Sequence, residues 1–142
     1  MIPMLRAVLM SALLAASVGA QAWSMFAHEH IAELAERQLS PGTRSAALAL
    51  LEGEAESLAA VAGWADRVRD EAGYEWATPL HFINFPRGRC EYDAARDCPG
   101  GACVVAAVER FAAETGDASL PRAQRAEALK FLVHYVGDLH QP

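Results

Sequence analysis

Residues 128–142 read ALKFLVHYVGDLHQP, and this stretch indicates both a fold class and a site. Apolar side chains recur there at helical spacing and predict a helix over residues 121–139 with a broad apolar arc. The remaining strip in the last turns holds His134, Gly137 and Asp138 instead of Lys or Glu. His134 and Asp138 lie four residues apart, so both can reach one cation, although His-x-x-x-Asp also arises by chance.

The rest of the chain also has helical rather than strand-like patterning. Helices are expected over residues 26–39, 43–51, 57–69 and 104–114, which predicts an all-α domain. Residues 76–96 differ, because Pro79, Pro86 and Gly88 interrupt them. We expect an irregular segment there rather than a helix.

Residues 1–22 have the features of a secretory signal peptide. One charge, Arg6, precedes an uncharged apolar run that ends in Ala20-Gln21-Ala22, a small-x-small cleavage site. The alternative is a membrane anchor, but the run is shorter than the roughly 20 residues that span a bilayer. Cleavage after Ala22 would leave Trp23 as the first residue, with a free α-amino group. We therefore expect a secreted or periplasmic protein without stable membrane association.

The mature chain, residues 23–142, is long enough for one modest domain. Removal of Arg6 changes the formal net charge from −6 to −7. Such an acidic protein would not hold nucleic acid or an anionic membrane through a general basic field. A phosphate-containing substrate would need local positive charge, which a bound metal could supply.

The cysteines number three, so one remains without a partner in this chain. Cys98 and Cys103 enclose only Pro-Gly-Gly-Ala, a flexible turn that allows a local disulfide. Cys90 is then either a free thiol or the partner of a cysteine outside these 142 residues.

Several other side chains are candidates for chemistry. On the first helix, His28 lies within the apolar stripe and is either a core residue or a ligand, whereas His30 faces solvent. Asp66 and Arg69 are three residues apart and fit an ordinary surface ion pair. His81 lies in the irregular segment. As a set, the candidate residues supply nitrogen and oxygen ligands of the type that zinc accepts, as would the Trp23 amine and carbonyl; the side chains are His28, Asp66, His81, His134 and Asp138.

Five ordered motifs extend through the mature chain. They are Trp-x4-His at residues 23–28, SLAAVAGWADRVR at 57–69, LHFINFP at 80–86, RDCPGGACVVAAV at 96–108 and ALKFLVHYVGDLHQP at 128–142. With these motifs the chain resembles the zinc-dependent single-strand nucleases and 3′-nucleotidases of the S1/P1 type. The resemblance implies a mainly helical fold, shared with zinc phospholipases C, and a site with three zinc ions.

The resemblance also implies roles for individual residues. Asp66, His81, His134 and Asp138 would bind one zinc. A second zinc would be bound by the Trp23 amine and carbonyl, His28 and Asp138, so Asp138 would bridge the two ions. Asp66 and Arg69 would be catalytic, with Arg69 contacting phosphate. Phe82 would stack on a base, and Asn84 stands where a fungal relative has an aspartate that contacts a base edge.

The sequence departs from the family pattern in two respects. Ser24 and Ala27 replace two glycines of the first motif. The larger departure is that the chain stops at HQP, where the family continues with the ligands of the third zinc and a cysteine that would pair with Cys90. We therefore expect a truncated or partial chain, about half of a family member, with ligands for two zinc ions.

These features predict an endonuclease that hydrolyses the P–O3′ bond of single-stranded DNA or RNA and of 3′-nucleotides, leaving 5′-phosphates. We expect a monomer. A zinc phospholipase C is the alternative enzyme, although its first histidine lies further from the N-terminal tryptophan than here. A catalytically inactive zinc-binding fragment is the alternative outside the enzymes.

Overall fold

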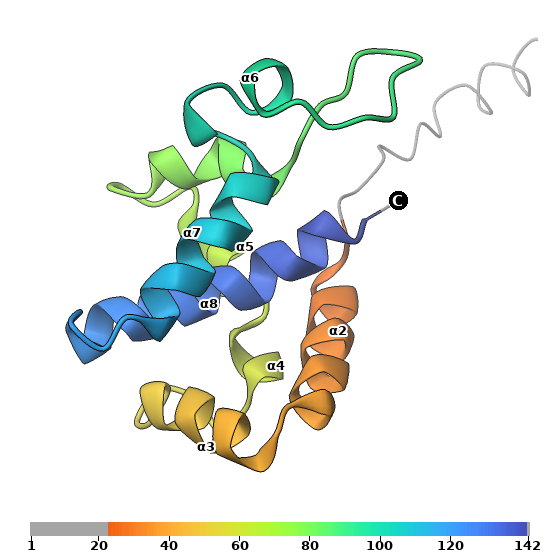
Figure 1. Cartoon of the computed structure of the whole chain (residues 1–142). Coiled ribbons are helices and arrows are strands. Elements are labelled where there is room, and N and C mark those ends of the chain that lie inside the picture. The colour runs from red at the N-terminus through yellow and green to blue at the C-terminus, as the bar shows by residue number, and fades with distance from the viewer. Residues whose placement is uncertain (1–22, 142) are drawn as a thin grey trace, which may run out of the picture.

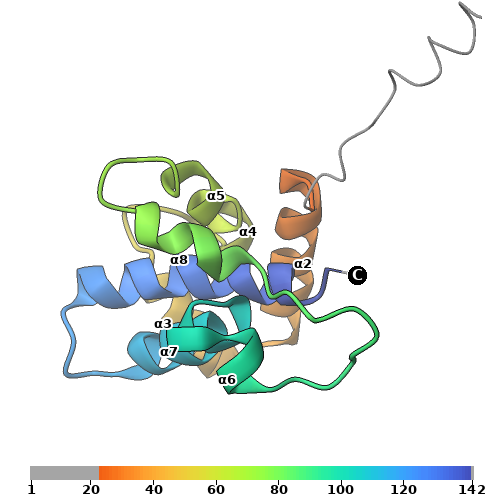
Figure 2. The ribbon, with the colours of Figure 1, turned by 90° about the horizontal axis from the view of Figure 1, so that it is seen from above.

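The computed structural model describes residues 23–141, so the expected signal peptide at residues 1–22 lies outside the described residues. Within residues 23–141 every regular element is a helix, which confirms the all-α prediction. Helix α8 (Arg122–Leu139) runs through the middle of the molecule (Figures 1 and 2), and α2, α3, α4, α5, α7 and η1 all contact it. In the same residues, no helix is long and apolar enough to cross a membrane.

Four helices agree with the sequence prediction to within about two residues at each end. They are α2 (Met25–Gln38), α3 (Pro41–Leu50), α7 (Val104–Gly116) and α8. The start of α3 shows how local chemistry sets such a boundary. The Ser40 Oγ accepts a hydrogen bond from the Thr43 backbone N–H (3.2 Å), and Pro41 occupies the first helical position, where no N–H is needed.

The single helix predicted over residues 57–69 was wrong, because the chain forms two short helices there. These are α4 (Leu58–Val61) and α5 (Trp64–Val68), separated by Ala62 and Gly63. The Ala62 carbonyl faces the Nδ1 atom of His134 (2.7 Å). Gly63 packs so closely on Met25 that a Cβ atom would lie 1.8 Å from its Sδ atom. The interruption therefore serves packing against α2 and α8.

The prediction of irregular structure over residues 76–96 was only partly correct. Residues Glu75–His81 form a 3-10 helix, η1, which tolerates Pro79. From Phe82 to Asp93 the chain is irregular, and it then forms the short helices α6 (Ala94–Asp97) and η2 (Pro99–Gly101). The 3-10 helix places His81 at its end, directly before the irregular loop.

Two apolar clusters hold α8 from opposite sides. In the first, Phe111 of α7 stacks on Phe131 (4.8 Å between ring centroids), which stacks on Tyr135 (5.5 Å). In the second, Leu129 of α8 packs with Leu51 and with residues of α2 and α4. Burial of these side chains contributes about 25 cal/mol per Å² of apolar surface. Both clusters fix the orientation of α8 and thus of the polar strip in its last turns.

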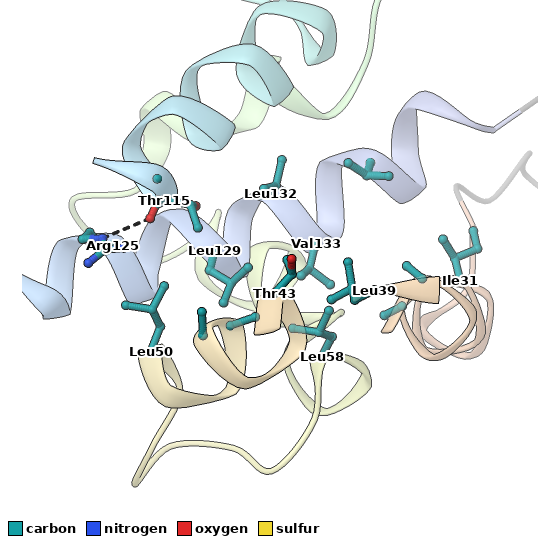
Figure 3. A pocket seen from close by; sticks show the side chains of 16 residues that line it. Ile31, Leu39, Thr43, Leu50, Leu58, Thr115, Arg125, Leu129, Leu132 and Val133 are labelled. Carbon is teal, nitrogen blue, oxygen red and sulfur yellow. Dashed lines mark hydrogen bonds between the residues drawn. The ribbon is translucent and has the colours of Figure 1, made fainter. Parts of the chain in front are cut away.

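The second cluster borders an open hollow of about 450 Å³. Figure 3 shows Ile31 of α2, Leu39 directly after α2, and Leu132 and Val133 of α8 among the side chains that line it. Near one end, Arg125 donates to the backbone carbonyl of Thr115 (3.0 Å). The lining has almost no polar surface, in contrast to the strip that carries His134 and Asp138.

Candidate metal centre

The last turns of α8 bring His134 and Asp138 together. Both side chains are buried, and the Nε2 atom of His134 lies 3.1 Å from the Oδ2 atom of Asp138. Their spacing of four residues therefore has the effect predicted from the sequence. Burial of a carboxylate costs free energy unless hydrogen-bond donors or a cation compensate its charge. The groups around Asp138 therefore indicate what compensates it.

Helix α2 brings His28 to the same point. The His28 ring stacks on the His134 ring (4.0 Å between centroids), and its Nε2 atom lies 3.4 Å from the Oδ1 atom of Asp138. The approach depends on Gly137, since a Cβ atom there would lie 2.6 Å from the Nδ1 atom of His28. The sequence showed that Gly137 lies on the polar strip of α8. It did not show that Gly137 leaves space there for the His28 ring.

Two further elements complete the group. At the end of η1, the His81 Nδ1 atom lies 3.0 Å from Asp138 Oδ2 and 3.1 Å from His134 Nε2. On α5, the Asp66 Oδ1 atom lies 3.7 Å from each of the same two histidine nitrogens. We call the five side chains on α2, α5, η1 and α8 the His–Asp cluster: His28, Asp66, His81, His134 and Asp138.

The spacing within the His–Asp cluster suits a tetrahedral metal site. Nitrogen and oxygen ligands about 2.0–2.2 Å from a common zinc ion lie about 3.3–3.6 Å from one another in a tetrahedron. The five distances given above among Asp66, His81, His134 and Asp138 lie on either side of this range, at 3.0–3.1 Å and 3.7 Å, and within about 0.3 Å of it. Two overlapping triads within the His–Asp cluster could hold a metal ion; they are His28, Asp66 and His134, and His81, His134 and Asp138.

The hydrogen bonds of His134 favour a cation at the centre. The Ala62 carbonyl can only accept, so the His134 Nδ1 atom must carry a proton to bond it. In a neutral ring, Nε2 then presents a lone pair toward the carboxylates of Asp66 and Asp138. These groups repel unless a proton or a metal ion lies between them. A carbonyl on the far nitrogen is also the usual means of orienting a metal-binding histidine.

Unpaired buried nitrogens point to the same conclusion. Both ring nitrogens of His28 and the Nε2 atom of His81 are buried without a hydrogen-bond partner among residues 23–141. The His28 Nε2 atom is close to Asp138 but does not have hydrogen-bond geometry toward it. An unsatisfied buried polar group costs about 1–3 kcal/mol. Metal ligation would satisfy the His28 Nε2 atom, which faces Asp138, so the residues present fit a bound metal. The His81 Nε2 atom lies on the far side of a ring that faces the cluster through Nδ1.

Asp138 is the electrostatic centre of the His–Asp cluster. Burial alone would raise the pKa of its carboxyl, but the neighbouring imidazole rings of His134, His28 and His81 outweigh burial and hold that pKa well below its usual range. For His134, burial lowers the pKa of the ring. The nearby carboxylates of Asp138 and Asp66 raise that pKa by more than burial lowers it, so the net direction is upward. Asp138 is therefore an anion at neutral pH.

Arg69 lies at the rim of the cluster. Its Nη1 atom donates to the Asp66 Oδ1 atom (3.0 Å), and its side chain is 38% exposed. The ion pair expected from the sequence is therefore present. The same Asp66 oxygen faces His81 and His134, so the guanidinium lies beside the candidate metal position and is open to solvent.

The remaining residues singled out from the sequence lie on the chain segments next to His81 and His28. Phe82 and Asn84 are exposed on the loop after His81, and the Phe82 carbonyl accepts from the Val104 N–H (3.1 Å). Trp23 is half-buried before α2, and the His28 N–H donates to the Ser24 carbonyl (3.3 Å), one helical turn away.

His30 was expected to face solvent, and it is exposed, as is His140 after the last turn of α8. The Nδ1 atom of His140 lies 2.7 Å from the Val136 carbonyl at the end of α8. The predicted disulfide between Cys98 and Cys103 is also present, with a Cα–Cα distance of 5.2 Å, and Cys90 is an exposed free thiol.

Comparison with known proteins identifies relatives of this chain. The family model described as S1/P1 Nuclease matches residues 23–142. Nuclease P1 of Penicillium citrinum is 36% identical over 124 residues, which cover 84% of this chain and 46% of the relative. Endonuclease 2 of Arabidopsis thaliana is 35% identical, with coverage of 92% and 48%. Nuclease S1 of Aspergillus oryzae is 33% identical, with coverage of 84% and 43%.

The matched region contains all five motifs and every member of the His–Asp cluster. The chain spans a little under half the length of each of these relatives. Since the family model covers the whole of the described part and far more than half of the sequence, the chain belongs to the S1/P1 nuclease family.

Proposed function

We propose that this chain carries a two-zinc site of a nuclease that hydrolyses the P–O3′ bond of single-stranded DNA or RNA and of 3′-nucleotides. The products would carry 5′-phosphates. The observation that carries the proposal is the convergence of the His–Asp cluster from four elements, at ligand-to-ligand distances of 3.0–3.7 Å, in a member of a nuclease family.

One zinc would be held by Asp66, His81, His134 and Asp138. The second would be held by His28, Asp138 and the amine and carbonyl of Trp23. The two oxygens of Asp138 support this division, because Oδ2 faces His81 and His134 while Oδ1 faces His28. When bound, zinc supplies a Lewis acid toward the phosphate and lowers the pKa of a water molecule.

The chain's own residues would bind and orient the substrate. Arg69 is exposed enough to contact a phosphate oxygen while Asp66 holds its guanidinium in place, so it would stabilise negative charge that develops on the phosphate. Phe82 would stack on a base, and Asn84 would contact the base edge. Stacking on a side chain needs an unpaired base, which explains a preference for single strands.

Export would be coupled to assembly of this site. The amine of Trp23 becomes free only when residues 1–22 are removed after Ala22. The protein would therefore acquire its second zinc as a secreted or periplasmic monomer. The disulfide between Cys98 and Cys103 is consistent with an oxidising compartment.

Substitution of Asp138 by Ala tests the proposal, because it removes one ligand from both ions. Elemental analysis should find about two zinc ions per wild-type chain that begins at Trp23, and fewer in the variant. Cleavage of a single-stranded oligonucleotide should fall by roughly 10³-fold or more, since each 1.36 kcal/mol of lost transition-state stabilisation is about tenfold in rate.

The matched control is His140→Ala, which removes an exposed histidine two residues away from Asp138. This variant should keep both zinc content and cleavage rate. The site is misassigned if Asp138→Ala keeps its zinc and most of its activity, or if His140→Ala is the more damaging change. A wild-type protein that binds zinc but cleaves no oligonucleotide would support the inactive alternative.

A further inference from the structure

A hollow of about 490 Å³ lies directly beside the His–Asp cluster. His81 and Asp138 form one side of it, and the loop after η1 forms another. Three large aromatic residues line it and remain exposed: Phe82 (51%), Phe85 (45%) and Tyr92 (45%). In Figure 2 this loop extends on the same side of the molecule as the C-terminal end of α8. The proposed function uses only Phe82 of these three.

The backbone on both sides of Tyr92 is fixed by one ion pair. Arg96 donates through Nη2 to the Glu91 carbonyl (2.7 Å), and the Asp93 N–H donates to the Asp97 Oδ2 atom (2.9 Å). Tyr92 therefore lies between two anchored residues, although its loop has no helical or strand hydrogen bonding.

The ion pair itself is tight, and its carboxylate is shielded from solvent, whereas the Arg96 side chain is 33% exposed. Arg96 contacts both carboxylate oxygens of Asp97, at 2.6 and 2.7 Å, and the Asp97 side chain is fully buried. Pairs in which an arginine contacts both oxygens of a carboxylate have strict geometry. Since the partners of this pair are the backbone groups that flank Tyr92, its effect is to hold that side chain at the hollow.

The segment that contains Arg96 and Asp97 is also linked to Phe82, on another side of the hollow. The Phe82 carbonyl accepts from the N–H of Val104, the first residue of α7, and Cys103 before it is joined to Cys98 directly after Asp97. The backbone at Phe82 is thus bonded to the start of α7, and the backbone on both sides of Tyr92 is bonded to Arg96 and Asp97. The Cys98–Cys103 disulfide joins these two attachment points. Neighbouring exposed apolar side chains often mark a binding site, and here Phe82 and Tyr92 are anchored beside a hollow next to the candidate metal site.

We propose that Tyr92, positioned by Arg96 and Asp97, is a second base-contacting residue of the substrate site. The ligand class is an unpaired nucleobase attached to a phosphate that lies at the His–Asp cluster, and the inference rests on the proposed nuclease function. The ring supplies an aromatic face and the phenol supplies a hydrogen-bonding group for the base edge. Arg96 and Asp97 act through Tyr92 and are positioning residues.

Equilibrium binding tests this inference without relying on turnover. Calorimetry would compare thymidine 5′-monophosphate with inorganic phosphate, both added to zinc-loaded protein. Tyr92→Ala should raise the Kd for the nucleotide by about 5- to 100-fold, the range of one lost base-stacking contact, and leave the Kd for phosphate unchanged. Phe26→Ala is the control, because Phe26 is 66% exposed but lies outside the hollow.

The positioning role has a separate readout. Asp97→Asn should weaken nucleotide binding in the wild type but add nothing in a Tyr92→Ala background, because the two changes then remove the same contact. A purely structural loss would weaken binding in both backgrounds. Tyr92→Phe keeps the ring and should retain most of the affinity, which guards against a misfolded Tyr92→Ala variant.

The outcomes separate the two hypotheses. If the wild-type protein binds phosphate but gains nothing from the base, the proposed nuclease function fails. If the wild type prefers the nucleotide and Tyr92→Ala keeps that preference, the nuclease function stands and the role of Tyr92 is wrong. An equal loss of phosphate and nucleotide binding in Tyr92→Ala would also overturn the proposed role of Tyr92.

Discussion

Replacement of Gly137 by Ala reverses the usual effect of such a change in a helix. In an ordinary helix interior, Ala in place of Gly stabilises by about 0.5–1 kcal/mol. Here the new Cβ atom would lie 2.6 Å from His28 Nδ1, so the ring must move by about 0.8 Å to reach ordinary contact at 3.4 Å. His28 is buried and stacked on His134, and overpacking of this kind costs about 1–3 kcal/mol. The free energy of unfolding should therefore fall by about 1 kcal/mol.

The same displacement should weaken metal binding, because it moves a ligand. We expect a loss of zinc affinity of about 10- to 100-fold, the range seen when the support of a metal ligand is disturbed. Urea denaturation of the metal-free chain and competition with a chelator would measure the two effects. Gly42→Ala is the control, since Gly42 lies in the first turn of α3 and a Cβ atom added there would meet nothing within 4 Å. Increased stability with unchanged zinc affinity in Gly137→Ala would refute the proposed approach of His28.

Three further predictions concern other parts of the chain. The pKa of Glu36 is lowered from 4.5, chiefly by the hydrogen bond from the Leu58 N–H, so its stabilising effect is complete above pH 4.5 and is lost at lower pH; Glu36→Gln should lower stability by about 1–2 kcal/mol at pH 7 and flatten this acid dependence in urea titrations. Joint replacement of Cys98 and Cys103 by Ser should cost about 2 kcal/mol, the closure entropy of a short loop, and a urea midpoint that does not move would contradict this. One extra residue before Trp23 should reduce zinc from about two ions to one per chain by elemental analysis, whereas undiminished zinc would exclude the amine as a ligand.

Helical periodicity predicted most of the fold because it reports local burial. The arc on residues 121–139 identified α8 and placed His134 and Asp138 on one side of it, as observed. The break at Ala62 could not be predicted in this way, because residues 57–69 have good helical patterning throughout. A contact with His134, distant in sequence, takes the Ala62 carbonyl out of the helix. Tertiary contacts of this kind override local propensity.

The candidate site was harder to predict from the sequence than the fold. Residue types and spacing indicated ligands on separate segments, but only the family resemblance indicated that His28, Asp66 and His81 meet at α8. The structure adds what the motifs do not contain, such as the reason for Gly137 and the role of the Ala62 carbonyl. Both belong to the support of the ligands, and support of this kind depends on backbone geometry rather than on residue type.

Removal of metal should affect the whole fold, because the His–Asp cluster joins α2, α5, η1 and α8. An ion bound only by the folded chain stabilises it by RT ln(1 + [L]/Kd), about 2.7 kcal/mol at 100 times the Kd and about 4.1 kcal/mol at 1,000 times. The urea midpoint should therefore rise with the logarithm of the free zinc concentration above the Kd, with an unchanged slope of the transition. In Asp138→Ala this rise should be largely lost, whereas His140→Ala should retain it. If equilibrium dialysis shows zinc bound to the wild-type chain while the midpoint stays constant, the metal binds the unfolded chain equally well, and the cluster is not the preformed site that its distances indicate.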